Sequence, residues 1–227
     1  MTWATTDELL GPLNDVERRN APVHVYLGGD RALLEAGPRV SVVGSRRASE
    51  AGLANARHIA DWLARHDMVV VSGLADGIDT AAHTSAITAG GRTIAVLGTA
   101  LDACYPATNR ALQAEIIRDH LALSQFAPGT PVQTKNFPMR NRTMALVSHA
   151  TIIVEAAEKS GSLHQGWEAL RLGRPLFILE PMLHDATLSW PREMVGYGAM
   201  AIRPDALEPL SDFLPESGRA DLAEITA

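Results

Sequence analysis

The sequence is poor in cysteine and lysine and has no long apolar run. Its single cysteine, Cys104, excludes an internal disulfide and a metal site built from several cysteines, and this favours a reducing, cytoplasmic location. No stretch reaches 18 uncharged apolar residues, so we expect no membrane-spanning helix. The first twenty residues are acidic and lack a basic segment followed by an apolar one, so we also expect no secretory signal.

Several signatures of nucleotide-dependent and hydrolytic enzymes are also missing. The chain has no GxxxxGK[ST] phosphate loop, no complete GxGxxG dinucleotide fingerprint and no GxSxG nucleophile elbow. His164 and Glu168 lie four residues apart, but no other histidine or cysteine has the spacing to complete a metal site with them. We therefore expect no catalytic residues, no cofactor and no bound metal.

What the chain does have is the composition of an ordinary globular protein. Apolar residues make up 46% of its 227 residues and charged residues 20%, which suits one α/β domain with short extensions. The formal net charge is −6, so a nucleic-acid partner would need a local basic patch. The basic residues are two lysines, Lys135 and Lys159, and eighteen arginines.

Short apolar runs alternate with segments of helical periodicity along most of the chain. Strands are expected at 23–27, 39–43, 68–71, 93–97, 121–123, 151–154 and 175–179, and helices at 49–66, 78–89, 109–118, 140–148 and 162–172. This alternation predicts an α/β fold, a mostly parallel sheet with helices on both faces.

The remaining segments carry weaker patterns. Residues 1–21 are expected to be a lead-in, either a short helix or mobile, before a domain at 22–214. Residues 129–138 are expected to form an irregular loop, and 197–202 an element at the edge of the sheet. The small, polar residues of 215–227 predict a flexible tail.

Glycine and small polar residues follow four of the predicted strands. Because ligands of such sheets bind beyond the carboxyl ends of the strands, these turns predict one binding rim. The turns are Gly44-Ser45-Arg46-Arg47, Ser72-Gly73, Gly98-Thr99, and Glu155 followed by Ser160-Gly161-Ser162.

The first of these turns has the chemistry of a phosphate site. Gly44 allows a sharp turn and close approach of a ligand, and the helix that follows presents free amides and a positive dipole end. Ser45 adds a hydroxyl, and Arg46 and Arg47 add guanidinium groups suited to bidentate contacts. The alternative is an ordinary strand–helix turn with solvated arginines.

A second segment joins positive charge to an aromatic ring. Residues 135–142 contain three cations and no acid, with a proline beside Phe137. Unpaired nucleic acid is bound by such surfaces, because cations contact phosphates and a ring stacks on a base. The alternative is that Phe137 is a core residue at the start of a solvated helix. The candidate residues are Lys135, Phe137, Arg140, Asn141 and Arg142.

A third segment, 72–83, has two readings. Asp79 is placed to cap a helix, and His83, four residues on, lies on the same helix face. The pair is therefore expected to be structural, with an acid–base pair as the alternative.

Taken together, these segments resemble the DNA-processing protein A family, also called DprA or Smf. The motifs that carry the resemblance span roughly residues 22–180 in one order. They are Val43-Gly44-Ser45-Arg46, Ser72-Gly73-Leu74-Ala75-Asp76-Gly77-Ile78-Asp79, Ala82-His83, Gly90 to Gly98, Leu101-Asp102, Tyr105-Pro106, Asn109, Phe137-Pro138-x-Arg140-Asn141-Arg142, Val154-Glu155-Ala156, Ser160-Gly161-Ser162-Leu163 and Gly173-Arg174-Pro175.

The resemblance implies an extended Rossmann-like domain that binds single-stranded DNA, forms a homodimer and, in transformable bacteria, loads a RecA-type recombinase. It also implies that Arg46 and the segment from Lys135 to Arg142 line the DNA pocket, and that the protein is not an enzyme. The chain departs from the family pattern at Gln125, at 164–166 and after Glu180. Neither a winged-helix domain nor a substantial N-terminal helical domain is expected within these 227 residues.

Two other functions remain open from the residues alone. The related lysine-decarboxylase-like (LOG) group cleaves nucleoside monophosphates with an acidic residue near a glycine-rich turn, and Glu155 or Glu168 would take that role here. The missing Pro-Gly-Gly-x-Gly-Thr motif argues against such a nucleotide binder or N-glycosidase. A third reading is an interaction protein that uses the fold as a scaffold, since one fold hosts many functions.

Overall fold

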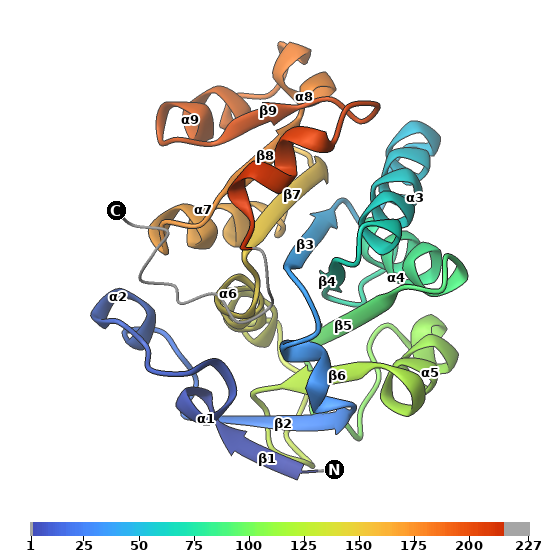
Figure 1. The fold of residues 1–227 in the computed structure, drawn as a ribbon, viewed down its shortest axis with the longest axis vertical. Helices are drawn as coiled ribbons and strands as arrows, with labels where there is room; N and C mark the ends of the chain where they lie inside the picture. Colours follow the sequence, from blue (N-terminus) through green and yellow to red (C-terminus); the bar gives the residue numbers. More distant parts are fainter. Residues whose placement is uncertain (1, 216–227) are drawn as a thin grey trace.

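The computed structural model describes residues 2–215, whose strands form one nine-stranded sheet in the order β1-β2-β6-β5-β4-β3-β7-β8-β9 (Figure 1). β1 pairs antiparallel with β2, and β2 with β6, whereas every other pairing is parallel. The predicted mostly parallel sheet is therefore confirmed. The strands are β1 (Thr2–Thr5), β2 (His24–Gly29), β3 (Arg39–Gly44), β4 (Val69–Ser72), β5 (Arg92–Leu97), β6 (Leu121–Ser124), β7 (Ala150–Glu155), β8 (Leu176–Leu179) and β9 (Met200–Ile202).

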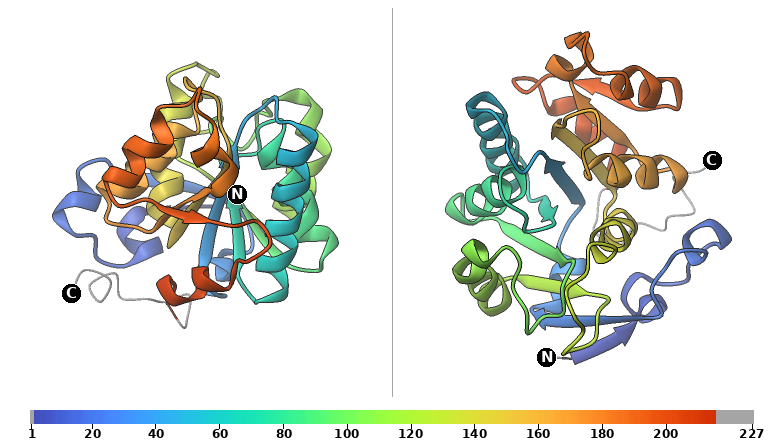
Figure 2. Two further views of the ribbon diagram at one scale, coloured as in Figure 1. Left: turned by 90° about the horizontal axis from the view of Figure 1, so that it is seen from above. Right: turned by 180° about the vertical axis from the view of Figure 1, so that it is seen from behind.

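Helices cover both faces of the sheet, as predicted. α3, α4 and α5 lie on one face, and α6 and α7 lie on the other (Figures 1 and 2). Within residues 2–215, none of the helices is both long enough and apolar enough to cross a bilayer. The α-helices are α1 (Thr6–Leu10), α2 (Asp15–Arg18), α3 (Glu50–Arg65), α4 (Ile78–Thr88), α5 (Arg110–Asp119), α6 (Asn136–Val147), α7 (Leu163–Arg171), α8 (Glu180–His184) and α9 (Trp190–Gly196), with 3-10 turns at Arg31–Leu34, Ala107–Asn109 and Glu208–Phe213.

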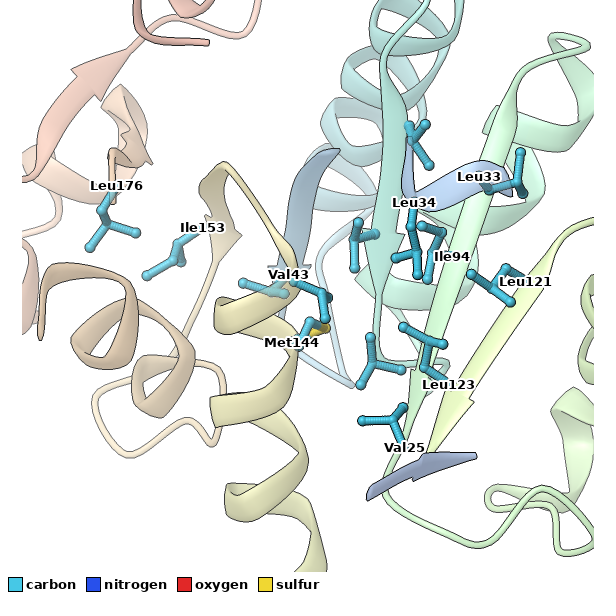
Figure 3. Close-up of a cluster of buried hydrophobic side chains, with 14 of the residues drawn as sticks. Val25, Leu33, Leu34, Val43, Ile94, Leu121, Leu123, Met144, Ile153 and Leu176 are labelled. Atoms are coloured by element: carbon cyan, nitrogen blue, oxygen red, sulfur yellow. The ribbon is translucent and has the colours of Figure 1, made fainter. Parts of the chain in front are cut away.

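The apolar strands divide their side chains between two cores. Successive residues of a strand point to opposite faces, so Val42 packs with the α3 and α4 side chains while Val43 packs with Met144 of α6. Figure 3 shows Val43 and Met144 side by side in the core on the α6 face. Burial on both faces explains why apolar residues predominate on both sides of these strands.

Residues 1–21 contribute more structure than the sequence pattern indicates. β1 adds an edge strand to the sheet, but only Ala4 of its four residues is buried, so it carries no apolar run. Glu17 of α2 forms an ion pair of 2.9 Å with Arg174, and both side chains are buried. α8 and α9 were also not predicted, whereas β9 confirms the expected edge element at 197–202. The predicted tail lies outside the described residues, except for Pro215.

α6 begins earlier than predicted, which is a correction to the expected loop at 129–138. The helix starts at Asn136, so Phe137 and Pro138 belong to its first turn. Proline is tolerated there because the first amides of a helix have no intrahelical acceptor. Phe137 is therefore presented by a regular helix and not by a loop.

The chain order of the strands creates a crevice between β3 and β7. After β3 the chain proceeds through β4, β5 and β6 on one side, then returns to place β7 on the other side of β3. Ligands of open parallel sheets bind beyond the strand ends at this kind of reversal. The first predicted phosphate turn follows β3, and the Ser160-Gly161-Ser162 turn follows β7, so both lie at this crevice.

Candidate nucleic-acid interface

A cavity of about 760 Å³ lies at the carboxyl ends of β3 and β7. Its walls are the β3–α3 turn, the first turns of α6, and the segment that joins β7 to α7. Three of the segments predicted to bind a ligand therefore meet around one cavity. The predicted residues that line it are Gly44, Ser45, Arg46, Arg47, Phe137, Arg140, Asn141, Ser160, Gly161 and Ser162.

The β3–α3 turn is held against the end of β7. The Ser45 amide donates to the Glu155 carbonyl at 2.7 Å, and a Cβ added at Gly44 would lie 2.7 Å from the same oxygen. The Ser45 hydroxyl accepts from the Arg47 amide at 3.1 Å. This packing fixes the turn and leaves the side chains of Arg46 and Arg47 exposed at the cavity.

Arg46 and Phe137 lie together although 91 residues separate them in the chain. The Arg46 guanidinium carbon is 5.3 Å from the centroid of the Phe137 ring, within the range of a cation–π contact. The Tyr105 ring lies 5.4 Å from the Phe137 ring at an angle of 51°. Phe137 reaches this position because Gly98 has no side chain; a Cβ there would be 2.6 Å from the ring.

Arg140 has a different environment from Arg46, because it is only 5% exposed. Its guanidinium donates to the carbonyls of Gly73 and Val96, the latter at 2.8 Å, and its Nε donates to Asn141 Oδ1 at 2.9 Å. Burial lowers the pKa of Arg140, and nearby Arg46 adds to this, while the charge of Asp79 opposes it. Arg140 therefore connects α6 to the ends of β4 and β5 and forms part of the cavity floor.

Asn141 continues this connection to the turn before α7. Its Nδ2 donates to the Gly161 carbonyl at 3.0 Å. Within that turn the hydroxyls of Ser160 and Ser162 are 2.7 Å apart. The turn that follows β7 is therefore fixed relative to α6.

Four other predicted residues lie outside the larger cavity. Ser72 is fully buried and its hydroxyl donates to the Val42 carbonyl at 2.7 Å. Gly73 lines a smaller adjoining cavity of about 30 Å³. Lys135 and Arg142 are exposed at α6 and are not among the residues that line either cavity. Lys135 and Arg142 can therefore contact only a ligand that extends out of the cavities along α6.

The capping role predicted for Asp79 needs correction, although Asp79 and His83 are both buried and make structural contacts, as predicted. The N-cap of α4 is Gly77, whereas the Asp79 carboxylate accepts from the amides of Gly73 and Ala75, both at 3.2 Å. His83 Nδ1 contacts Thr93 Oγ1 at 2.7 Å. Both side chains point into the protein because α4 packs directly on the sheet. The partners of Asp79 lie in the loop between β4 and α4, and the partner of His83 lies on β5.

Exposed residues at the cavity that sequence reasoning missed include Tyr105, Lys159 and His164. Lys159 could have been found, because it is one of two lysines and directly precedes the Ser160-Gly161-Ser162 turn. His164 was weighed only as a metal ligand. Tyr105 precedes Pro106 in a loop with no periodic pattern, so only the tertiary structure brings it to Phe137.

The cavity has the opposite charge to the chain. Among the described residues that line it, Arg46, Arg47 and Lys159 are exposed cations, and the one acid is the buried Asp79. Burial raises the pKa of Asp79, against the charge of Arg140 beside it. A net charge of −6 is therefore compatible with a local site for anions.

The two carboxylates considered for nucleotide cleavage are both engaged. Glu155 accepts from the Ser49 amide at 2.9 Å and from its hydroxyl at 2.5 Å, at the start of α3. Glu168 is buried and pairs with Arg171 at 2.5 Å. These contacts assign both acids to structural roles. In the described part of the chain, no three His, Cys, Asp or Glu side chains are grouped to hold a metal ion.

Comparison with known proteins shows the family to which this chain belongs. The family model described as DNA recombination-mediator protein A matches residues 7–211. The chain belongs to this family. The predicted resemblance to DprA and Smf proteins is thereby confirmed.

Relatives of the recombination-mediator A family match over most of the chain. The DNA processing protein DprA of Streptococcus pneumoniae is 40% identical over 183 residues, which is 81% of this chain and 64% of the relative. DprA of Bacillus subtilis is 36% identical and covers 86% of this chain and 65% of the relative. The chain thus spans just under two thirds of the length of these curated relatives.

Solved structures of family members confirm the Rossmann-like fold. An X-ray structure of S. pneumoniae DprA superposes with a TM-score of 0.78 at 35% identity, covering 92% of this chain and 73% of that one. A structure of Helicobacter pylori DprA, a protein with a single-stranded DNA binding mode, superposes with a TM-score of 0.77 at 27% identity, covering 93% of this chain and 97% of that one.

Proposed function

We propose that this protein binds single-stranded DNA through the cavity between β3 and β7 and the adjoining face of α6. The observation that carries the proposal is the placement of the Arg46 guanidinium over the Phe137 ring at the cavity. A cation beside an accessible ring is the combination that an unpaired strand requires, because it offers both phosphates and base faces. The H. pylori relative binds single-stranded DNA.

The proposed roles follow from exposure. Arg46 and Arg47 contact phosphates at the β3–α3 turn, together with Lys159 at the opposite wall, because these cations are exposed at the cavity. Lys135 and Arg142 extend the contacts along α6. Phe137 is partly exposed and stacks on a base. Ser160, Gly161 and Ser162 supply hydroxyl and amide groups, whereas Ser72, Gly73, Arg140 and Asn141 hold the backbone around the cavity in place.

The first prediction concerns Arg46. We expect Arg46→Ala to weaken binding to a fluorescein-labelled (dT)20 by about tenfold to thirtyfold, because both a phosphate contact and the cation beside Phe137 are lost. The slope of log Kd against log salt should fall by about one. Fluorescence anisotropy titrations at several salt concentrations measure both quantities.

The matched control is Arg57→Ala, since Arg57 is exposed on α3 and is not among the cavity residues. Arg57→Ala should bind (dT)20 as the natural chain does. If the natural chain bound no (dT)20 at low salt, or bound it without salt dependence, the proposed function would be wrong.

The family resemblance also supports three further proposals. We propose that the protein forms a homodimer, works in the cytoplasm, and hands single-stranded DNA to a RecA-type recombinase. Sedimentation of the purified chain tests the dimer. Filament assembly by a RecA-type recombinase on DNA coated with a single-strand-binding protein, with and without this chain, tests the loading step.

A further inference from the structure

We infer that Tyr105 forms a second base-stacking surface, so that a bound strand leaves the larger cavity over the loop between β5 and α5. The inference rests on the proposed function and adds to it a further contact and a direction for the strand. Tyr105 is 49% exposed and lines both the larger and the smaller cavity. An aromatic ring with half its surface in water at a binding cavity is a ready platform for a base.

The geometry makes Tyr105 continuous with the first stacking residue. Its ring lies 5.4 Å from the Phe137 ring, tilted by 51°, and Arg46 lies on the same Phe137 ring at 5.3 Å. All three side chains line both cavities and so mark the boundary between them. A DNA strand that crosses this boundary would pass from Arg46 to the Phe137 ring and then to the Tyr105 ring.

The loop that carries Tyr105 is held at both ends. Thr99 Oγ1 donates to the Ala103 carbonyl at 3.0 Å, and Gln113 Nε2 donates to the same oxygen at 3.1 Å. After the tyrosine, Asn109 Nδ2 donates to the Leu74 carbonyl at 3.0 Å. Because the loop is fixed before a ligand arrives, stacking on Tyr105 costs little ordering entropy.

Local charge decides which part of a nucleotide meets Tyr105. The smaller cavity is lined by Asp76, whose carboxylate accepts from Thr108 Oγ1 at 3.0 Å. Asp102, exposed in the same loop, accepts from the Gly129 amide at 3.0 Å. These acids repel phosphates, so the backbone stays near Arg46 and Arg47 and the uncharged base faces the ring. The smaller cavity holds about 30 Å³, so the base lies on the ring surface and does not enter it.

The test compares Tyr105→Ala and Tyr105→Phe with the natural chain on labelled oligo-dT of 3 to 20 nucleotides. We expect Tyr105→Ala to weaken (dT)20 binding about tenfold, in line with the loss of one stacked base. Tyr105→Phe should bind within about twofold of the natural chain, since the ring and not the hydroxyl makes the contact. The salt slope should not change, because no charge is removed. The deficit should disappear for oligonucleotides too short to reach beyond Phe137.

Tyr197→Ala is the matched control, because Tyr197 is 70% exposed but is not among the cavity residues. It should leave (dT)20 binding unchanged. The inference would be overturned if Tyr105→Ala bound oligo-dT of every length as tightly as the natural chain. It would also be overturned if Tyr105→Phe lost as much affinity as Tyr105→Ala. If Tyr105→Ala does not fold, Tyr105→Trp provides the test. The fluorescence of the introduced tryptophan should be quenched when (dT)20 binds, and an unchanged signal would refute stacking at this position. Absence of binding by the natural chain would instead overturn the proposed function.

Discussion

Arg140→Ala is expected to destabilise the protein by about 3–5 kcal/mol and to lower its melting temperature by about 10 °C. Arg140 is 5% exposed and donates to the carbonyls of Gly73 and Val96. Its removal leaves these acceptors without their donor and leaves the buried Asp79 carboxylate without the nearby cation that opposes the rise in its pKa. Unpaired polar groups and charges in the interior are among the largest single costs in protein stability.

The matched control lies two residues further along the same helix. Arg142 is exposed, so Arg142→Ala should change the free energy of unfolding by less than about 0.5 kcal/mol. It should instead weaken (dT)20 binding and reduce the salt slope by about one, because it removes a cation facing solvent. Thermal unfolding and anisotropy titrations of both variants separate the two roles.

The opposite pattern would assign the roles differently. If Arg140→Ala kept the melting temperature of the natural chain and lost a unit of salt slope, Arg140 would contact DNA directly. A Gly73→Ala variant gives an independent check, because a Cβ at Gly73 would overlap the Arg140 guanidinium. It should therefore reproduce part of the stability loss with both charges still present.

Glu17→Ala is the second change with a large expected effect, a loss of about 3–5 kcal/mol in the free energy of unfolding. Glu17 and Arg174 are 3% and 5% exposed and form an ion pair of 2.9 Å. Arg174 also donates to the carbonyls of Ala145, Leu146 and Ser148 at the end of α6. Without Glu17 its charge is buried with only neutral partners. Chemical denaturation of the variant measures the loss.

Asp61→Ala provides the contrast for this prediction. Asp61 pairs with Arg65 at 2.7 Å on α3, but the two side chains are 38% and 68% exposed. Solvent screens such pairs, so the loss should stay below about 1 kcal/mol. If Glu17→Ala cost no more than Asp61→Ala, residues 1–21 would be a separable lead-in to the domain. A large loss would make them part of the same folding unit.

Much of the sheet was accessible from local pattern. β3, β4 and β7 are buried on both faces, so valine and isoleucine dominate them, and these apolar segments alternate with amphipathic helices. The sequence pattern does not predict β1, because only Ala4 of this strand is buried and its strand conformation comes from pairing with β2. The predicted start of α6 is too late because proline usually marks a loop, although a first helical turn accepts proline such as Pro138.

The candidate site was likewise predictable only in part. The turns that follow β3 and β7 could be placed on one rim from the order of strands and helices, because parallel strands end at one edge of their sheet. The resemblance implied that Arg46 and the segment from Lys135 to Arg142 line one pocket, but the contact between Arg46 and the Phe137 ring is known only from the structure. The difference between Arg140 and Arg142 was beyond the sequence, since both are arginines of the same segment, two residues apart, and only burial separates them.

Residue pattern alone was thus enough for the fold class and for the edge of the sheet at which the candidate residues gather, because these depend on periodicity and on the order of elements along the chain. The family followed from the resemblance of the motifs. Three-dimensional packing decided which cations remain exposed, which hold backbone carbonyls, and which ring accompanies Phe137. The physical reason is desolvation: the role of a charged or aromatic side chain depends on how much water its neighbours remove, and those neighbours come from distant parts of the chain.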